Sequence, residues 1–329
     1  MDVIANRQLL AKLRRIARRF PLVWPAYRMH WKIRRWLESR KDYPENRTIQ
    51  YFGEFASPTL DQPVTQLCTS AQMLSKTYDR WCDAMHSPAR FSRKQWEFVF
   101  ILQALSLKGM LSPGRVGLGF GCGREPLAGL FASHGCQIMA TDLAPETAKD
   151  QGWVATMQHA SSLEALYQCA DEFVSREVFF DRVDFRVVDM NTIPDDLSGK
   201  FDFVWSACAL EHLGSLRHGM DFVKNSVRCL KPGGVAVHTT EFNISSLEQT
   251  LESTGCSIYR ACDIEQLIRE LVADGYEVAP LNLNTGTAPV DHHVDLPPYG
   301  FSPHLKLMLE GYVVTSIGLI VSRPTGLDQ

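Results

Sequence analysis

Two short segments combine acidic and imidazole side chains that could perform acid–base chemistry. Glu211 and His212 are adjacent in "CALEHLGSL", and His238 and Glu241 lie three residues apart in "VHTTEFN". Because a neutral imidazole has a reference pKa of about 6.5, either histidine could accept the proton of a hydroxyl near neutral pH. Either histidine could equally be a packed, hydrogen-bonded residue without a chemical role. We predict that the catalytic residues are among these four, with His212 and His238 as the candidate bases.

A glycine-rich stretch, "VGLGFGCGREPLAGLF" (116–131), indicates a ligand-binding turn. Glycines occupy every second position from 117 to 123, between a predicted strand and a predicted helix, where the backbone of an open α/β sheet approaches its ligand. Glu125 would stand in the first turn of that helix and repel the pyrophosphate of NAD or FAD, which disfavours a dehydrogenase. A ligand that carries positive charge and no phosphate, such as S-adenosylmethionine, removes this objection.

Two aspartates end the strands that follow this turn. Asp142 ends "CQIMATD", about 20 residues after the turn, where a dinucleotide-binding fold has the acid that binds ribose hydroxyls. A helix cap or a loop acid is the alternative for Asp142. Asp189 ends the next predicted strand, in "VVDMNTIP".

The segments that hold these residues alternate between strand and helix patterns. Such alternation predicts a doubly wound, mostly parallel α/β sheet, and "HLKLMLEGYVVTSIGLIV" (304–321) predicts an antiparallel C-terminal hairpin that turns at Glu310 and Gly311. The chain before this region is helical in pattern and interrupted by prolines. We predict a helical N-terminal extension or substrate lid over residues 1–112 and a Rossmann-like domain over 113–329. The predicted strands are 115–120, 136–142, 183–189, 201–206 and 233–240.

Residues from about 115 to 321 resemble the Rossmann-fold (class I) S-adenosylmethionine-dependent methyltransferases. The resemblance rests on ordered elements: the "GCG" turn, the two strand-end aspartates, "FDFVWS", "ALEHLGS", "CLKPGGVAVHTTE" and the closing hairpin. It implies a seven-stranded sheet closed by that hairpin and S-adenosylmethionine as the cofactor. It also implies roles for single residues. Gly121 and Gly123 would surround the methionine portion, Asp142 would bind the ribose, Asp189 and Met190 would contact the adenine, and Ser206 would lie near the methyl group.

Two positions of the predicted cofactor site depart from that family. Gly119 stands where the family usually has an acidic residue, and Glu125 stands where it usually has a glycine. Both remain candidate cofactor-binding residues, and Glu125 is a candidate partner for the ammonium group of the cofactor.

A leucine-glutamate-histidine after the fourth strand also occurs in ubiquinone-pathway and small-RNA O-methyltransferases. This likeness makes His212 the first candidate base. In those families a glutamate three residues before Glu211 helps to bind a divalent metal, but that position is Cys208 here. We therefore predict no metal ligands, and a divalent cation at Glu211 stays open as an alternative. The polar segment "DHHVDLPPYG" (291–300) lacks the spacing of a metal site and is predicted to be a substrate loop, and the long connection 143–182 is predicted to shape the acceptor pocket.

The charge is distributed unevenly along the chain. The net charge is −3, yet residues 1–41 contain twelve Lys and Arg against only Asp2 and Glu38. Apolar residues at helical spacing within 9–20 predict a basic amphipathic helix that contacts an anionic membrane or packs on the acidic remainder of the chain. Nine cysteines without a CxxC pair argue against a disulfide framework or a zinc site. We predict a cytoplasmic protein, which is peripheral at the membrane if the basic helix contacts anionic lipid.

The predicted function is methyl transfer from S-adenosylmethionine to a hydroxyl of a sugar, a glycolipid or another polar small molecule. The partner is therefore a small-molecule or glycan acceptor. An RNA methyltransferase or nucleic-acid binder that uses the basic N-terminal arm is the alternative, although the acidic remainder of the chain disfavours nucleic acid. A cofactor-binding scaffold without catalysis is a further alternative, which the polar residues at 211–241 disfavour.

Overall fold

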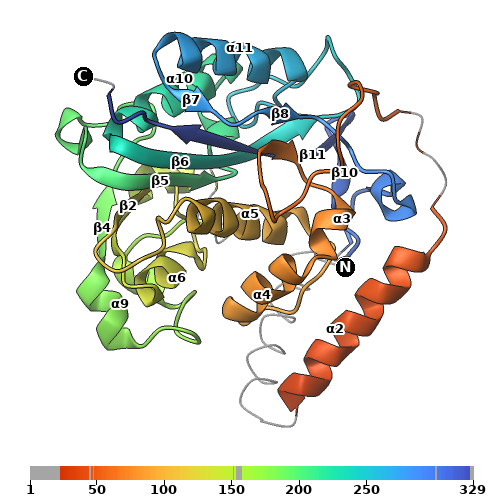
Figure 1. The fold of residues 1–329 in the computed structure, drawn as a ribbon, viewed down its shortest axis with the longest axis horizontal. Coiled ribbons are helices and arrows are strands. Elements are labelled where there is room, and N and C mark those ends of the chain that lie inside the picture. The colour runs from red at the N-terminus through yellow and green to blue at the C-terminus, as the bar shows by residue number, and fades with distance from the viewer. Residues whose placement is uncertain are drawn as a thin grey trace.

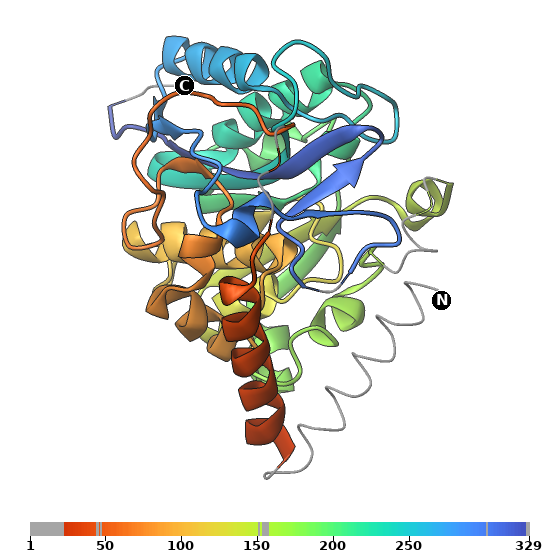
Figure 2. The ribbon, with the colours of Figure 1, turned by 90° about the vertical axis from the view of Figure 1, so that its right-hand side faces the viewer.

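A computed structural model describes residues 23–326 apart from 44, 45, 47, 151, 153–157 and 301. The predicted amphipathic helix at 9–20 lies outside the described residues. Within them the chain forms one large sheet with helices on both faces (Figure 1 and Figure 2). No helix in this part of the chain is long and apolar enough to cross a membrane.

Five parallel strands form the centre of the sheet and confirm the predicted α/β fold. Their order is β4-β3-β2-β5-β6, so the chain starts in the middle and winds outward in both directions. In such an arrangement ligands bind beyond the carboxyl ends of the strands, near the point where the direction reverses. That point lies between β2 and β5. The strands are β2 (Val116–Gly119), β3 (Gln137–Asp142), β4 (Val183–Val187), β5 (Phe201–Ala207) and β6 (Leu230–Asn243).

The predicted hairpin closes the sheet on the β6 side. Strand β10 (Lys306–Leu309) turns into β11 (Tyr312–Ser322), which runs antiparallel to β6. Glu310 and Gly311 have positive φ angles of 48° and 87° at this turn, as a tight hairpin requires.

Short strands extend the sheet to eleven among the described residues. β1 (Thr65–Leu67) and β7 (Glu277–Val278) each pair antiparallel with a different part of β11, so together they take the place of a seventh long strand. β8 (Leu281–Asn282) pairs with β1, and β9 (Val294–Asp295) pairs with β10. The segment before residue 112 thus contributes a strand to the same sheet, while the predicted domain boundary stays a prediction.

Helices cover the two faces of the sheet. Helices α5 (Arg93–Leu107) and α6 (Leu127–Ser133) lie on one face, and α10 (Leu216–Ser226) and α11 (Ala261–Ala273) lie on the other (Figure 1). Serine side chains cap the N-termini of several helices. At the start of α10, the Ser215 side chain accepts a hydrogen bond from the His218 backbone N–H. The other α-helices of the described residues are α2 (Val23–Arg40), α3 (Ser70–Met73), α4 (Lys76–Ala84), α7 (Pro145–Asp150), α8 (Leu163–Tyr167) and α9 (Arg176–Arg182).

Helix α5 packs closely on the sheet although it belongs to the N-terminal segment. At Gly318 of β11 a Cβ atom would overlap the ring of Phe100 from α5. Phe100 is fully buried and stacks on Trp96, with ring centroids 4.9 Å apart. This packing brings the first turn of α5, with Arg93 and Lys94, beside the carboxyl ends of the strands.

Candidate active site

A cavity of about 330 Å³ lies at the carboxyl ends of β2, β3 and β5, where the direction of strand order reverses. The turn after β2 contributes Gly121, Gly123 and Glu125 to its wall. The other predicted site residues on the wall are Asp142, Met190 and His212.

The glycine turn has the conformation that its sequence predicts. Gly121 and Gly123 have φ angles of 56° and 52°, and a Cβ atom on Gly123 would lie 2.6 Å from the carbonyl oxygen of Gln158. Side chains are therefore excluded by both backbone conformation and space. Gly119 has a different role from the one predicted. It lies within β2, where a Cβ atom would overlap the indole of Trp205, so close packing rather than ligand contact requires this glycine.

Asp142 is buried in the cavity wall with an oriented carboxylate. Its Oδ1 accepts a hydrogen bond from the backbone of Leu143 (2.9 Å), and its Oδ2 accepts from Gly123 (3.1 Å) and Ala160 (3.0 Å). Burial raises the pKa of this carboxyl, and the backbone donors partly offset that effect. Oδ1 retains acceptor capacity, which suits a ribose hydroxyl.

The other predicted adenine contacts lie just after β4. Met190 and Val188 are buried and line the cavity. Asp189 lies between them with an exposed side chain, and its Oδ1 accepts a hydrogen bond from the Asn191 backbone (2.8 Å). The adenine-binding role of Asp189 stays a prediction.

Ser206 and His238 face the core, which corrects their predicted roles. The Ser206 hydroxyl lies 2.8 Å from His238 Nδ1, and the Ser226 hydroxyl lies 3.1 Å from His238 Nε2. His238 is 1% exposed, and burial lowers its pKa to about 3. An imidazole with two internal hydrogen bonds and no access to the cavity is not a candidate base. Side chains alternate between the faces of a strand, and position 238 falls on the face covered by α10.

Glu125 lines the cavity and forms an ion pair that the sequence did not predict. Lys94 from α5 places its ammonium 2.9 Å from Glu125 Oε1 and donates a hydrogen bond to the Ala207 carbonyl (3.0 Å). Glu125 Oε2 is buried and has no hydrogen-bond partner among the described residues. Burial raises the pKa of Glu125 to about 7 despite the neighbouring Lys94. No sequence signal pointed to Lys94, because it lies outside the methyltransferase-like region.

His212 stands on the cavity wall in a defined orientation. Its Nδ1 lies 2.7 Å from the Gly255 carbonyl oxygen. Because a carbonyl only accepts hydrogen bonds, Nδ1 carries the proton and Nε2 is the basic nitrogen. Nε2 lies 4.0 Å from Glu211 Oε1.

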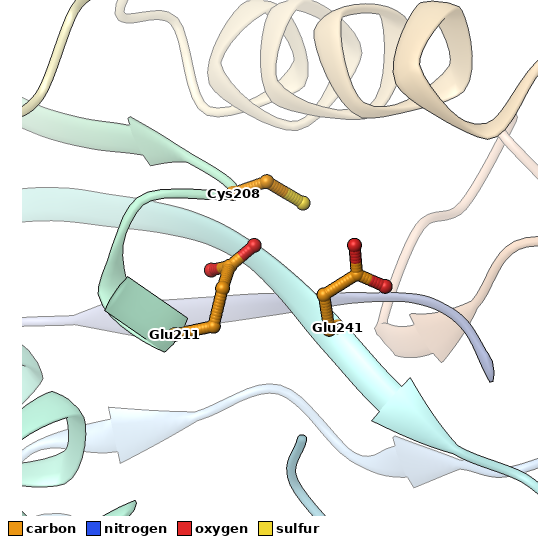
Figure 3. A group of neighbouring side chains, drawn as sticks. All are labelled: Cys208, Glu211 and Glu241. Atoms are coloured by element: carbon orange, nitrogen blue, oxygen red, sulfur yellow. The ribbon is translucent and has the colours of Figure 1, made fainter. Parts of the chain in front are cut away.

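Glu211 and Glu241 are buried close to each other (Figure 3). Glu211 lies in the 3₁₀ turn η2 (Leu210–His212), and its Oε2 accepts a hydrogen bond from the Thr240 hydroxyl (3.0 Å). Glu241 forms an ion pair with Arg93 of α5. Burial raises the pKa of Glu241 to about 7, with the charge of Arg93 opposing that effect. The structure thus brings Glu211 and His212 together with Glu241 and leaves His238 outside the group.

A second cavity of about 730 Å³ adjoins the first. Lys94, Phe98 and Arg124 belong to the walls of both. The connection between β3 and β4 contributes Gln168, Cys169, Asp171 and Glu172 to the lining, and its role in binding an acceptor stays a prediction. The other predicted substrate segment, 291–300, contributes to neither cavity. Its Asp291 accepts hydrogen bonds from the Ser70 backbone and hydroxyl, 2.8 Å each.

The sequence from residue 118 to residue 238 matches the family model of the methyltransferase domain. This segment of the chain is a methyltransferase domain, which agrees with the family that the sequence resembles. The match supports the predicted methyltransferase activity and S-adenosylmethionine as the methyl donor. The 330 Å³ cavity lies at the carboxyl ends of the strands, where a fold of this kind binds its ligand.

Several solved methyltransferase structures have similar folds at low sequence identity. Magnesium protoporphyrin IX methyltransferase from Synechocystis PCC 6803, with bound SAH, is 16% identical to this methyltransferase, with a TM-score of 0.40 over 76% of this chain and 95% of that one. A SAM-dependent methyltransferase from Methanosarcina mazei is 13% identical, with a TM-score of 0.42 over 67% and 97%. The glycopeptide N-methyltransferase MtfA, complexed with sinefungin, is 14% identical, with a TM-score of 0.40 over 68% and 93%. No curated protein sequence matches the chain.

Proposed function

We propose that this methyltransferase transfers a methyl group to a hydroxyl of a sugar, a glycolipid or another polar small molecule. The observation that carries the proposal is the 730 Å³ cavity with several hydrogen-bonding side chains in its lining, which adjoins the cofactor cavity at Lys94. Hydrogen-bonding side chains from the start of α5, from the turn after β2 and from the connection before β4 line it, and such groups can orient a polyhydroxylated acceptor. These include Ser92, Gln95, Arg124, Gln168 and Asp171.

The transfer is an in-line displacement in which the acceptor oxygen attacks the methyl carbon. The methyl–sulfur bond breaks, its electron pair stays on sulfur, and the hydroxyl proton passes to His212 Nε2. Alignment of the two reactants is worth up to about 7–11 kcal/mol in well-oriented cases. A positioned base contributes typically about 10²–10⁴-fold. His212 suits this role because it lines the cofactor cavity and its Nδ1 contact with Gly255 leaves Nε2 as the basic nitrogen.

The test is labelled methyl transfer from S-adenosylmethionine to a panel of monosaccharides, glycolipids and total RNA. We expect incorporation into a polar hydroxyl acceptor and a fall in turnover of about 10²-fold in His212→Gln, with cofactor affinity nearly unchanged. His218→Gln is the matched control, because His218 is an exposed imidazole in the nearby helix α10. Incorporation into RNA alone, or full turnover in His212→Gln, would contradict the proposal.

We further propose that the N-terminal region contacts an anionic membrane surface. One side of α2 exposes four large apolar side chains at helical spacing, namely Met29, Ile33, Trp36 and Leu37, each more than half exposed. Lys32 and Arg40 are exposed on the same helix. An apolar stripe flanked by basic residues favours the interface of an anionic bilayer. Burial of the apolar side chains and attraction of the basic side chains to anionic lipid both contribute to binding there.

A further inference from the structure

Three potential metal ligands converge beside the cofactor cavity (Figure 3). Cys208 follows β5, Glu211 lies in η2, and Glu241 lies near the end of β6. Their side chains point toward a common space, with the cysteine sulfur and one oxygen of each carboxylate all within 4.8 Å of one another. Cys208 also forms part of the cavity wall.

Each of the two glutamates is held by one oxygen and offers the other. Glu211 is 1% exposed and Glu241 is 6% exposed. Thr240 engages Glu211 Oε2, and Arg93 engages Glu241 Oε1. Within the described part of the chain, Glu211 Oε1 and Glu241 Oε2 have no hydrogen-bond partner. Because a buried carboxylate oxygen without a partner is costly, a cation held between these two atoms would stabilise them.

The surrounding charges are also unbalanced. The connected network contains four carboxyl groups and two cations, which leaves a formal excess of two negative charges when all four carboxyl groups are ionised. A single divalent ion would neutralise that excess. The network consists of Glu97, Glu125, Glu211, Glu241, Arg93 and Lys94.

The backbone at Cys208 is in an unusual conformation. Its φ angle is 49°, in the left-handed region that favours glycine, and its backbone N–H is fixed by the Thr239 carbonyl (2.9 Å). A cysteine in this conformation costs more than a glycine would. A thiol thus stands close to Glu211 and Glu241 at a position where glycine would cost less in backbone strain.

We propose that Cys208, Glu211 and Glu241 bind one zinc ion next to the methyl-transfer cavity. Zinc accepts one thiolate at about 2.3 Å and carboxylate oxygens at about 2.0–2.2 Å, and a catalytic site leaves a fourth position open. Magnesium and calcium prefer sites made only of oxygen, so the thiol favours zinc. Zinc binding releases the thiol proton to solvent and requires the three side chains to contract slightly around the ion. The sequence left a divalent cation at Glu211 open. The group in the structure joins Glu211 with Cys208 and Glu241 and does not include His212.

The fourth position suits the acceptor. Because Cys208 lines the cavity, an acceptor hydroxyl bound to zinc there would lose its proton more readily. This role rests on the proposed function, whereas the metal site itself does not.

The experiment measures metal binding by the full-length protein, independently of methyl transfer. The protein is stripped with a chelator, equilibrated with buffered zinc chloride, and analysed for zinc per chain by mass spectrometry. We expect about one zinc per chain, and at least a tenfold weaker affinity in each of Cys208→Ser, Glu211→Gln and Glu241→Gln. Cobalt substituted for zinc should show thiolate-to-metal charge-transfer absorption that disappears in Cys208→Ser.

The control is Cys262→Ser, because Cys262 is an exposed cysteine on α11 and should not affect the site. Calorimetric binding of S-adenosylmethionine shows whether each variant is folded. Loss of zinc in a variant that still binds S-adenosylmethionine would support the site. Wild-type protein that binds S-adenosylmethionine but no zinc would overturn the site and leave the proposed function standing. Absence of the cobalt–thiolate absorption in the wild type, or full zinc binding by Cys208→Ser, would also overturn the site.

Discussion

At the scale of single residues, Glu125 is the departure from the family that the structure explains. A carboxylate is tolerated at this position of the glycine turn because Lys94 approaches from α5 and forms an ion pair with Oε1. Oε2 remains directed into a buried environment without a partner among the described residues. We therefore propose that this carboxylate, when ionised, binds the ammonium group of S-adenosylmethionine.

This position predicts a pH-dependent cofactor affinity. Burial raises the pKa of Glu125 to about 7, with Lys94 opposing the shift and Glu97 and Asp142 adding to it. The carboxylate is ionised above that pH and neutral below it, so we expect affinity for S-adenosylmethionine to fall as pH decreases through 7. Calorimetry one unit above and one unit below pH 7 should show this fall in the wild type and little of it in Glu125→Gln. Equal pH dependence in both proteins would remove Glu125 from the cofactor site.

His238 predicts a pH-dependent stability. Its pKa is about 3 in the folded protein and about 6.5 when unfolded, so protonation favours unfolding. The stabilising effect of the neutral imidazole is complete above pH 6.5 and is lost as pH falls toward 3, by at most about 1.4 kcal/mol per pH unit. Denaturant unfolding between pH 6 and 4 should therefore show a steeper loss for the wild type than for His238→Gln. Parallel losses would mean that His238 is not buried as described.

At the scale of elements, α2 differs from the other long helices because its apolar residues lie on two sides. Trp31 is buried on the side where Arg35 donates hydrogen bonds to the Met73 carbonyl (2.8 Å) and to Asp79 (2.6 Å). Met29 and Ile33 are exposed on the other side. The inner contacts anchor the helix on the protein and leave the outer stripe available for a lipid surface.

The membrane proposal predicts that the outer stripe of α2 contributes to lipid binding. Trp36→Gln combined with Leu37→Gln removes apolar surface but no charge, and should reduce co-sedimentation with phosphatidylserine-containing liposomes severalfold. High salt should weaken the binding of the unchanged protein. Leu107→Gln is the matched control, because Leu107 is similarly exposed at the end of α5. Absence of liposome binding at low salt would leave α2 with a structural role only.

At the scale of the whole molecule, the N-terminal segment and the methyltransferase fold share one sheet and one core. β1 pairs with β11, and α5 packs on the same strand at Gly318. Arg93 and Lys94 then reach the carboxylates at the strand ends. The segment before residue 112 therefore supplies side chains that complete the site. Its predicted role as a substrate lid stays a prediction.

This arrangement predicts that a change at the contact between α5 and β11 destabilises the whole protein. In Gly318→Ala the new methyl group overlaps the buried Phe100 ring, and overpacking of this kind typically costs about 1–3 kcal/mol. Denaturant unfolding followed by tryptophan fluorescence and circular dichroism should show one coincident transition, shifted to lower denaturant. Gly326→Ala is the control, because nothing lies within 4 Å of a Cβ there. Separate transitions for the two signals would indicate that the segments unfold independently.

Some features of this protein follow from local sequence patterns alone. Alternation of strands and helices predicted the parallel sheet, and the turn at Glu310 and Gly311 predicted the hairpin. The glycine turn and Asp142 were located correctly as part of a cavity wall. These features depend on periodicity and on backbone conformation, which neighbouring residues determine.

Other features were decided only by the tertiary structure. Sequence spacing could not show that His238 points into the core or that Gly119 packs under Trp205, because each depends on which face of a strand meets a helix or a ring. Nor could it show that Lys94, from outside the recognised region, reaches Glu125. Such contacts join residues distant in the chain, and their geometry is determined by how whole elements pack, because close-packed interiors leave each side chain little freedom.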